Sequence, residues 1–498
     1  MSERRWPSSA TNINNEKRPT GVPISEVPPR LGCQVDSEAM RVRGSCERIV
    51  HFLSETWVGR LVVTAVLGLV LYYHFFDVFG DGEFRYHIDL DVYRSGGQAF
   101  VRGFGLYDRD YPVRGINLPF TYPPLAAILF STLTWFSLKT DTLLMVFATA
   151  AMTWWCGAVL INHFTDPVRT SCAGGKSAQQ TTTSSFKRAG WLSYMILPLV
   201  LLGEPFTHTL SFGQINVFLM ALVLLDTAVK RTCWPRGIFI GLAAAIKLTP
   251  AVFGLFFLVK RDWKSAITCA VSGAAWTAIG WAVLPHDSKD YWTVEIHNPD
   301  RIGGLAYAGN QSLRGMIVRF TNDNTLQSRW WVVLSVLTFG LIVTAMLRLI
   351  NTASKLRSDL ADPGAVNRLS ATGPRYEGQS FTIALVAATS LVALLLSPVS
   401  WSHHWVWFLP FVIVTMNAAW NSRHIIPRWQ NNVLWVVAVV GLMISTVTPF
   451  HWFFPNSDNQ ELQWSWIQKI AGSDYVLWGF LFLIAMALFP RAFTTEKS

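Results

Sequence analysis

The stretch GIFIGLAAAIKLTPAVFGLFFLV, Gly237–Val259, decides how this chain folds, because it is long and apolar yet interrupted in its middle. A helix that crosses a bilayer needs about 20 apolar residues. Pro250 removes a backbone donor and clashes with the preceding turn, and broken helices at membrane depth usually line a cavity. Lys247 is costly inside an apolar segment and indicates a functional site. We therefore expect the segment to dip into a membrane, break near Lys247 and face a polar cavity.

The whole chain has the composition of a membrane protein. Of its 498 residues 51% are hydrophobic and 14% charged, whereas soluble proteins carry about 25% charged residues. We predict an all-α polytopic membrane protein with about 10–12 membrane segments, some of them re-entrant. The formal charge of +10 fits Lys and Arg in cytoplasmic loops near anionic lipid, so we expect membrane lipids and no nucleic acid as partners. The other apolar runs are Val58–Phe76, Pro124–Leu138, Thr142–Phe164, Trp191–Leu202, Ile215–Val229, Ala266–Leu284, Trp331–Leu349, Ser380–Pro398, Trp405–Trp420, Val433–Thr448 and Tyr475–Phe489.

The distribution of Lys and Arg favours one of two topologies. Counting every apolar run as a full span is simpler, but it puts clusters of positive charge on both faces. If Pro124–Leu138 and Gly237–Val259 both dip in and return, every Lys/Arg-rich loop lies inside. This arrangement places both termini in the cytoplasm of a plasma-membrane protein. Five polar segments then lie on the periplasmic, outer side: Asp77–Pro123, Gly203–Gln214, Pro285–Trp330, Ser400–His404 and Phe450–Asp474.

The two ends of the chain differ in composition from its middle. Residues 1–56 are polar and rich in Pro, Ser and Arg, which predicts a disordered cytoplasmic tail. Residues 57–490 form the predicted transmembrane domain, and 491–498 a short cytoplasmic tail. The six cysteines lie in predicted cytoplasmic loops or spans, so no disulfide framework is implied. The sequence has no CxxC or HExxH spacing, and we expect neither a metal site nor a cofactor.

Two carboxylates, Asp89 and Asp91, directly follow the first apolar run in the stretch HIDLDVYRSGGQAF. The stretch resembles a helix lying at the membrane interface and ending at the Gly103 and Gly105 pair. A solvated acidic loop is the plain interpretation of either carboxylate. The alternative is a general base at a membrane-facing active site.

Polar and aromatic side chains recur in the other predicted outer loops. Each of these side chains has a plain interpretation. A histidine can lie at the membrane interface with its polar end solvated, and an Asn or Gln can cap a helix. Their convergence on one face favours a site, because the topology was chosen from Lys and Arg in the loops alone. The candidates are Asp89, Asp91, Tyr93 and Arg94; Tyr122; Glu204, His208, Gln214 and Asn216; Asn310, Gln311 and Arg314; and Trp401, His403 and His404.

Carboxylates, carboxamides, histidines and aromatic rings are typical of carbohydrate sites. An external site has no nucleotide sugar, so the donor would be a lipid-linked sugar whose phosphate needs cations. Lys247, Arg314 and Arg94 are the candidates for that phosphate. Only one carboxylate is then needed, as the general base that takes a proton from an acceptor hydroxyl. The residues predicted to bind substrate are Asp91, Tyr93, Tyr122, His208, Gln214, Asn216, Asn310, Gln311, Trp401, His403 and His404.

Six motifs carry a family resemblance. They are DLDVYRSGGQAF with GLYD, LPFTYPPLAAILF, FGQINVFLMALVLLD, GLAAAIKLTPAVFGLFFLVKRDWKSA, GNQSLRG and SPVSWSHHW. Between about Ile88 and Trp407 the chain resembles the GT-C polyprenol-phosphate-mannose-dependent α-(1,2)-mannosyltransferases. That family builds phosphatidylinositol mannosides, lipomannan and lipoarabinomannan in the envelope of mycolic-acid-containing actinobacteria. The resemblance implies a GT-C helical bundle whose first outer loop carries the catalytic aspartate on interfacial helices.

The resemblance also implies roles for single residues. The motif aspartate falls on Asp89, whereas Asp91 lies where the family varies, and the second essential polar residue is His403 or His404. The implied reaction is inverting and metal-independent, from polyprenyl phosphate mannose to a mannose 2-hydroxyl of a lipoglycan. The motifs do not predict the acceptor, the number of sugars added or the oligomeric state. Two alternatives stay open: an arabinofuranosyltransferase using decaprenyl phosphate arabinose, and a flippase or transporter of lipid-linked sugars.

Overall fold

The structure is a computed structural model that describes residues 52–53, 56–78, 80, 82–165, 176–230, 232–361, 379–446 and 449–494. The chain divides into two units, 1–52 and 53–498, and the fold below is that of the second. Most of the predicted tail 1–56 therefore lies outside the described residues. At the other end, residues 490–494 form a short helix in which Ala492 and Phe493 are buried.

The described residues are overwhelmingly helical. The first half contains α2 (Trp57–Phe75), α3 (Ile88–Arg102), β1 (Tyr111–Val113), β2 (Ile116–Leu118), α4 (Pro124–Phe130), η1 (Ser131–Trp135), α5 (Leu138–Thr165), α6 (Lys176–Leu202), α7 (Glu204–Phe212), α8 (Asn216–Thr227), α9 (Ile238–Ile246), η2 (Thr249–Phe253) and α10 (Gly254–Val259). The second half contains α11 (Trp263–Val283), α12 (Pro285–Thr293), η3 (Glu295–His297), η4 (Pro299–Ile302), α13 (Leu313–Phe320), α14 (Asn324–Ala361), α16 (Gln379–Leu396), η5 (Ser402–Trp407), α17 (Phe408–Ser422), α18 (Arg428–Thr446), η6 (Phe450–Trp452), η7 (Gln460–Gln463), α19 (Trp466–Ala471), α20 (Asp474–Leu488) and α21 (Pro490–Thr494).

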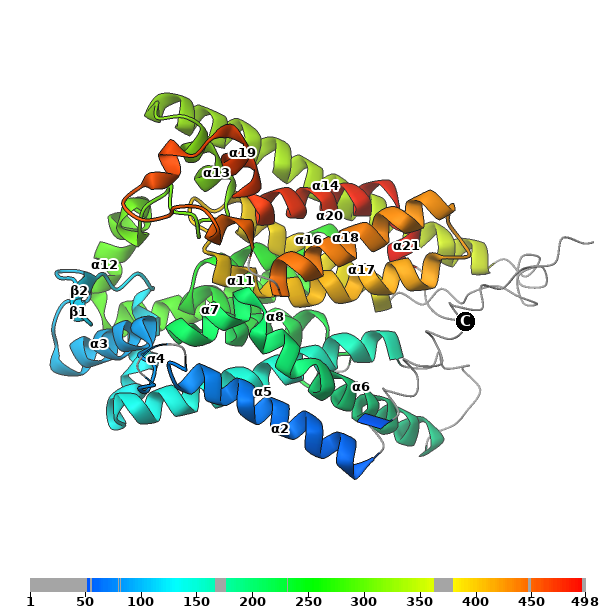
Figure 1. The fold of residues 1–498 in the computed structure, drawn as a ribbon, viewed down its shortest axis with the longest axis horizontal. Coiled ribbons are helices and arrows are strands. Elements are labelled where there is room, and N and C mark those ends of the chain that lie inside the picture. The colour runs from blue at the N-terminus through cyan, green and yellow to red at the C-terminus, as the bar shows by residue number, and fades with distance from the viewer. Residues whose placement is uncertain are drawn as a thin grey trace, which may run out of the picture. The chain divides into compact units, whose positions relative to one another are not determined.

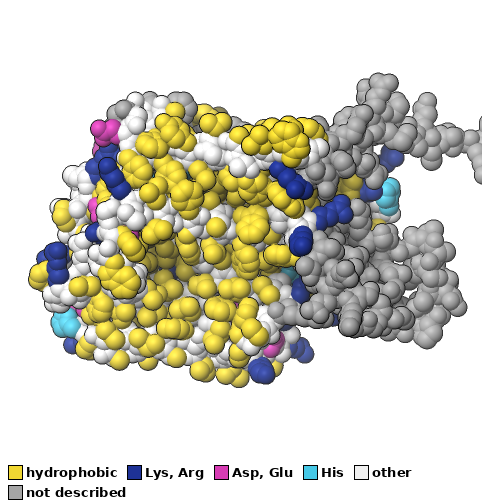
Figure 2. All heavy atoms as spheres, turned by 90° about the horizontal axis from the view of Figure 1, so that it is seen from below, with side chains coloured by type: hydrophobic (Ala, Val, Ile, Leu, Met, Phe, Trp, Pro, Cys, Tyr) yellow, Lys and Arg dark blue, Asp and Glu magenta, His cyan; other side chains and the backbone are white. Residues whose placement is uncertain are grey.

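Five described helices are long and apolar enough to cross a membrane, or six if the pair Ser185–Leu202 and Glu204–Phe212, bent by 75°, is one span. Five shorter apolar helices join them, among them Pro124–Trp135 and Thr249–Val259. Figure 2 shows hydrophobic side chains spread over one face of the bundle, with most Lys and Arg near its two edges. Leu69 on α2 and Val336 on α14 are 69% and 66% exposed. An apolar surface of this extent is suited to lipid, so the chain is a multi-pass membrane protein.

The segment Gly237–Val259 is broken at the predicted point. Helix α9 ends at Ile246, Lys247 has an extended backbone (φ −145°, ψ 126°), and η2 begins at Thr249 with Pro250 in its first turn. Proline is tolerated there because the first N–H groups of a helix have no partner within it. The break turns the Lys247 side chain away from the helix axis and into the protein.

The connecting elements gather at one end of the bundle, where α3, α12 and the β1–β2 hairpin lie together at the left of Figure 1. The predicted helix after the first apolar run is α3, and it ends at Gly103 in the left-handed conformation (φ 73°). Gly97 lets α3 approach the α4–η1 segment, because a Cβ there would lie 2.6 Å from the carbonyl oxygen of Phe130. The ring of Tyr93 stacks on Phe130 at 4.5 Å. This packing fixes the direction in which α3 points its side chains.

Candidate active site

One cavity of about 810 Å³ opens between these connecting elements. Its lining comes from α3, the loop before α4, α7, the break after α9, the segment 295–309, η5 and η6. Nine of the predicted site residues line it, although they come from five separate stretches of the chain: Asp89, Tyr93, Tyr122, His208, Gln214, Lys247, Trp401, His403 and His404. The predicted convergence of distant segments is therefore present in the fold.

Asp89 is held by a network that we call the polar wall, made of Asp89, Tyr93, Tyr122 and Gln214. The Gln214 amide donates to Asp89 Oδ2 at 2.7 Å. The Tyr93 hydroxyl donates to Gln214 Oε1 at 2.8 Å and lies 2.7 Å from the Tyr122 hydroxyl. Both tyrosines thus fix the amide so that its N–H₂ group faces the carboxylate. Asp89 also lies in the first turn of α3, where the helix dipole favours a negative charge.

The environment of Asp89 suits a base that works near neutral pH. Burial raises the pKa of Asp89 from 3.8 to about 6, although the hydrogen bond from Gln214 and the charge of Lys247 both lower it. A carboxylate with that pKa is mostly ionised at pH 7 yet binds a proton more readily than a solvated one. Such a balance is what general-base catalysis requires.

The second carboxylate, Asp91, has a different environment. Its Oδ2 accepts a hydrogen bond from the Tyr86 hydroxyl at 2.5 Å, and it does not line the cavity. Positions two apart on a helix point in nearly opposite directions, since each residue turns the helix by about 100°. Of the two carboxylates, only Asp89 lines the cavity.

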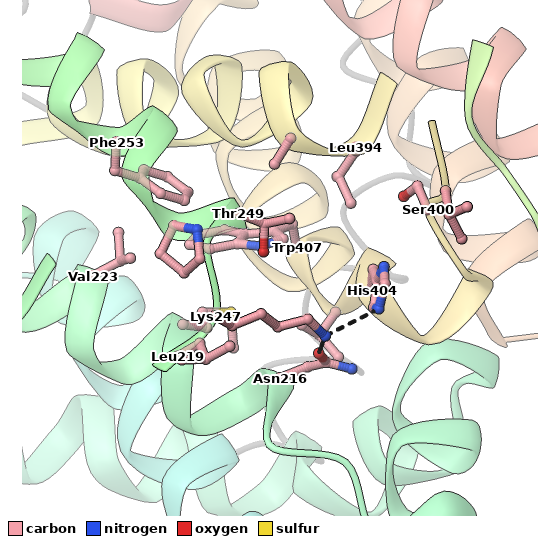
Figure 3. Close-up of a pocket in the computed structure, with 15 residues that line it drawn as sticks. Asn216, Leu219, Val223, Lys247, Thr249, Phe253, Leu394, Ser400, His404 and Trp407 are labelled. Carbon is pink, nitrogen blue, oxygen red and sulfur yellow. Dashed lines mark hydrogen bonds between the residues drawn. The ribbon is translucent and has the colours of Figure 1, made fainter. Parts of the chain in front are cut away.

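Lys247 lines this cavity and also a second, smaller one, in which Figure 3 shows its side chain directed toward Asn216 and His404. Its Nζ lies 3.2 Å from Nε2 of His404, 3.4 Å from Oδ1 of Asn216 and 3.4 Å from the Tyr122 hydroxyl. None of these three groups carries a negative charge. An ammonium surrounded by neutral partners at a cavity is ready to receive an anion.

The two adjacent histidines differ in what they contact. The Trp401 backbone N–H donates to Nδ1 of His404 at 3.2 Å. The main chain of His403 accepts hydrogen bonds from Asn216 at 3.0 Å and Thr209 at 3.1 Å, but its ring Nε2 has no partner among the described residues. Burial and the nearby Lys247 hold the pKa of both rings well below 6.5. Both imidazoles are therefore neutral.

Two predicted phosphate ligands do not line the cavity. Arg94 pairs with Asp141 at 2.7 Å and donates to the carbonyl oxygens of Leu133 and Phe136, so it ties α3 to the start of α5. The guanidinium of Arg314 lies over the ring of Trp331, 5.0 Å from its centroid. The geometry does not support phosphate binding by either arginine, because both are engaged elsewhere.

Three predicted carboxamide ligands lie behind the cavity surface instead of on it. Asn310 and Gln311 are fully buried. Asn310 Oδ1 accepts from the Ser400 N–H at 3.0 Å, and the Gln311 amide donates to the carbonyl oxygens of Ala308 and Gly472. They join the segment before α13 to the loop that carries the histidines. Asn216 contacts Lys247 from a second, smaller cavity next to the first.

The structure adds residues that the sequence did not single out. Arg301 lines the cavity, pairs with Glu295 and donates to the Phe120 carbonyl at 2.5 Å. Tyr307 and Trp452 line it as well. Arg301 and Tyr307 lie in the same predicted outer loop as Asn310. Their position in that loop could therefore have marked them as candidates. Trp452 lies in a loop that shares no motif with the resembled family.

A membrane-embedded helical bundle whose cavity brings together the Asp89 carboxylate and the Lys247 ammonium fits the class of integral-membrane glycosyltransferases. The model of Glycosyltransferase family 87 matches residues 120–366. The chain belongs to glycosyltransferase family 87, and the predicted all-α polytopic fold is confirmed.

Curated relatives agree with this assignment. The chain is 32% identical, over 88% of its own length and 94% of the relative's, to the polyprenol-phosphate-mannose-dependent α-(1-2)-phosphatidylinositol mannoside mannosyltransferase of Mycobacterium tuberculosis. It is 34% identical to the Mycolicibacterium smegmatis protein of that name, over 82% of this chain and 85% of the relative. An α-(1->3)-arabinofuranosyltransferase of Corynebacterium glutamicum is 31% identical over only 33% of this chain and 40% of its own.

Proposed function

We propose that this enzyme transfers mannose from polyprenyl phosphate mannose to a mannose 2-hydroxyl of a phosphatidylinositol mannoside or related lipoglycan, forming an α-(1,2) linkage. One observation carries the proposal: Asp89 and Lys247 face the same cavity, one as a carboxylate with a raised pKa and the other as an ammonium whose hydrogen-bond contacts among the described residues are all to neutral groups. Transfer from a lipid phosphate needs both a base for the incoming hydroxyl and a cation for the leaving group.

The relatives support mannose over arabinose. The two mannosyltransferases align over more than four fifths of the chain, whereas the arabinofuranosyltransferase aligns over one third. Their printed names specify a polyprenol phosphate mannose donor and a phosphatidylinositol mannoside acceptor. A transporter of lipid-linked sugars is disfavoured because membership in a glycosyltransferase family is established.

In the proposed reaction Asp89 takes the proton of the acceptor 2-hydroxyl. The hydroxyl oxygen attacks the anomeric carbon of the donor from the face opposite the phosphate and forms the new C–O bond. The bond between the anomeric carbon and the phosphate oxygen breaks, and polyprenyl phosphate leaves with the electron pair. Direct displacement inverts the anomeric centre, so a β-linked donor gives an α-linked product. Gln214 keeps the carboxylate aimed throughout.

Lys247 and His404 suit the leaving phosphate. Because a backbone N–H always donates, Nδ1 of His404 must accept from Trp401, and the hydrogen of the neutral ring is on Nε2. Nε2 of His404 and Nζ of Lys247 lie 3.2 Å apart. Both are then donors, so neither can accept from the other and each is left to donate to a ligand. A phosphate oxygen beside the pair can accept from both. Donors fixed in advance stabilise developing charge without reorganisation, and this arrangement calls for no metal or cofactor.

We further propose that the reaction takes place on the periplasmic side of the plasma membrane, with both termini in the cytoplasm. The Lys/Arg-rich loops support this orientation, because they fall on the opposite side from the cavity in the preferred topology.

Purified protein in detergent or liposomes tests the assignment directly. Polyprenyl phosphate [¹⁴C]mannose and decaprenyl phosphate [¹⁴C]arabinose are supplied separately with a phosphatidylinositol mannoside acceptor. The expected result is incorporation of mannose alone, released by an α-(1,2)-specific mannosidase. Label transferred from the arabinose donor, or a product resistant to that mannosidase, contradicts the proposal. Heat-inactivated protein provides the blank.

A further inference from the structure

The lining of the cavity also contains three aromatic rings from three separate loops. Tyr307 precedes α13, Trp401 precedes η5, and Trp452 belongs to η6. All three line the cavity. The ring centroids of Tyr307 and Trp401 are 5.9 Å apart, as are those of Tyr307 and Trp452, and both pairs meet edge to face. We call these three residues the aromatic wall.

The loops are shaped to bring these rings to the cavity. Gly303 has φ of +131°, a conformation that favours glycine, and a Cβ there would lie 3.0 Å from Trp401 Cζ2. A Cβ on Gly309 would lie 3.0 Å from Tyr307 Cε1 and 3.1 Å from Trp452 Cη2. Both glycines line the cavity themselves. The glycines therefore let the backbone pack closely against all three rings.

A buried carboxylate fixes the Trp452 ring from behind. Glu204 Oε1 accepts the indole N–H at 2.9 Å, and Oε2 accepts the Tyr475 hydroxyl at 2.6 Å. His208 is 3.0 Å from the same carboxylate, and its ring lies 5.1 Å from that of Trp452. The polar edge of the indole is thus satisfied by the protein, and the ring itself lines the cavity.

We propose that the aromatic wall is the acceptor subsite, on which the mannosyl ring that presents its 2-hydroxyl to Asp89 packs through its C–H face. This inference rests on the proposed function. A pyranose has one face of C–H groups and a rim of hydroxyls. Flat rings beside hydrogen-bonding groups match both parts, and Ser402 and His403 line the same cavity.

Trp452 is the least expected member of the subsite. It lies beyond the segment matched by the family model and belongs to the loop between α18 and α20. In this assignment the C-terminal outer loop, which shares no motif with the resembled family, sets acceptor affinity. It takes no part in the bond-making step.

Initial-rate kinetics on Trp452→Leu and Tyr307→Leu test the assignment. Tyr307 is 39% exposed, so its variant is expected to fold even if Trp452→Leu does not. We expect the acceptor KM to rise at least about tenfold for each, with the donor KM within twofold and kcat within about threefold. The matched control is Trp466→Leu, which removes a 71% exposed indole from the same loop without touching the cavity and should leave all constants unchanged. A raised donor KM with an unchanged acceptor KM overturns the inference.

A binding measurement separates this inference from the proposed function. Octyl α-D-mannoside is titrated onto Asp89→Asn protein, which binds without turnover, with and without Trp452→Leu. Weaker binding with Trp452→Leu supports the aromatic wall, and equal binding overturns it while the proposed function stands. No binding to either protein, together with no mannose transfer by the wild type, removes the proposed function itself.

Discussion

On the polar wall four side chains hold one another through hydrogen bonds of 2.7–3.2 Å, whereas on the aromatic wall three rings meet at their edges. The polar wall is directional: Gln214 fixes where the Asp89 oxygen points. The aromatic wall is a surface, and its one directional contact, from Trp452 to Glu204, lies behind it. A group that transfers a proton needs an exact position, but a group that packs on a sugar needs only a flat face. We therefore assign kcat to the first wall and acceptor affinity to the second.

The strongest test of this comparison is the carboxylate pair on α3. Asp89→Asn keeps the size of the side chain and an oxygen that can accept from Gln214, but it removes the base. General-base catalysis contributes 10²–10⁴-fold, so we expect kcat to fall about 10³-fold, with octyl α-D-mannoside binding retained. Asp91→Asn is the matched control and should stay within about threefold, since Asp91 contacts Tyr86 outside the cavity. Loss of activity in the control with retention in Asp89→Asn would reverse the assignment.

The next largest effect is expected at the cation of the site. Lys247→Gln removes the charge that faces the leaving phosphate, and loss of one preorganised group of this kind costs about 10²–10³ in kcat. Arg314→Gln is the control, because its guanidinium lies over Trp331. Rates measured at saturating donor and acceptor distinguish the two. A larger loss in Arg314→Gln than in Lys247→Gln would show that the phosphate site lies elsewhere.

The walls also differ in how far the sequence could predict them. Lys247 could be predicted from the sequence because a charge in an apolar segment is costly, and Asp89 could be predicted because it falls in a motif. Arg94 and Arg314 do not line the cavity, because the partners that they contact, Asp141 and Trp331, are set by packing and not by local pattern.

The position of Trp452 at the cavity could not be predicted from the sequence. Its partner Glu204 is 248 positions away, and both are side chains whose types are common in outer loops. The positions of helices, and a single charge in an apolar segment, can be predicted from a short stretch of sequence. The meeting of three loops around a cavity depends on the packing of the whole bundle.

The smallest expected effect is a shift in pH dependence, and it compares the walls within a single measurement. Because burial raises the pKa of Asp89 to about 6, the carboxylate is the active form above pH 6 and is lost as the pH falls. We expect kcat/KM of the wild type to drop roughly tenfold between pH 7 and pH 5.

Lys247 lowers the pKa of Asp89 through its charge. In Lys247→Gln the midpoint should therefore move upward. Trp452→Leu changes neither the burial of Asp89 nor its charged neighbour, so its midpoint should match the wild type. Profiles of kcat/KM over pH 4.5–8.5 measure all three. A midpoint that moved with Trp452→Leu but not with Lys247→Gln would mean that the two walls do not divide chemistry from affinity.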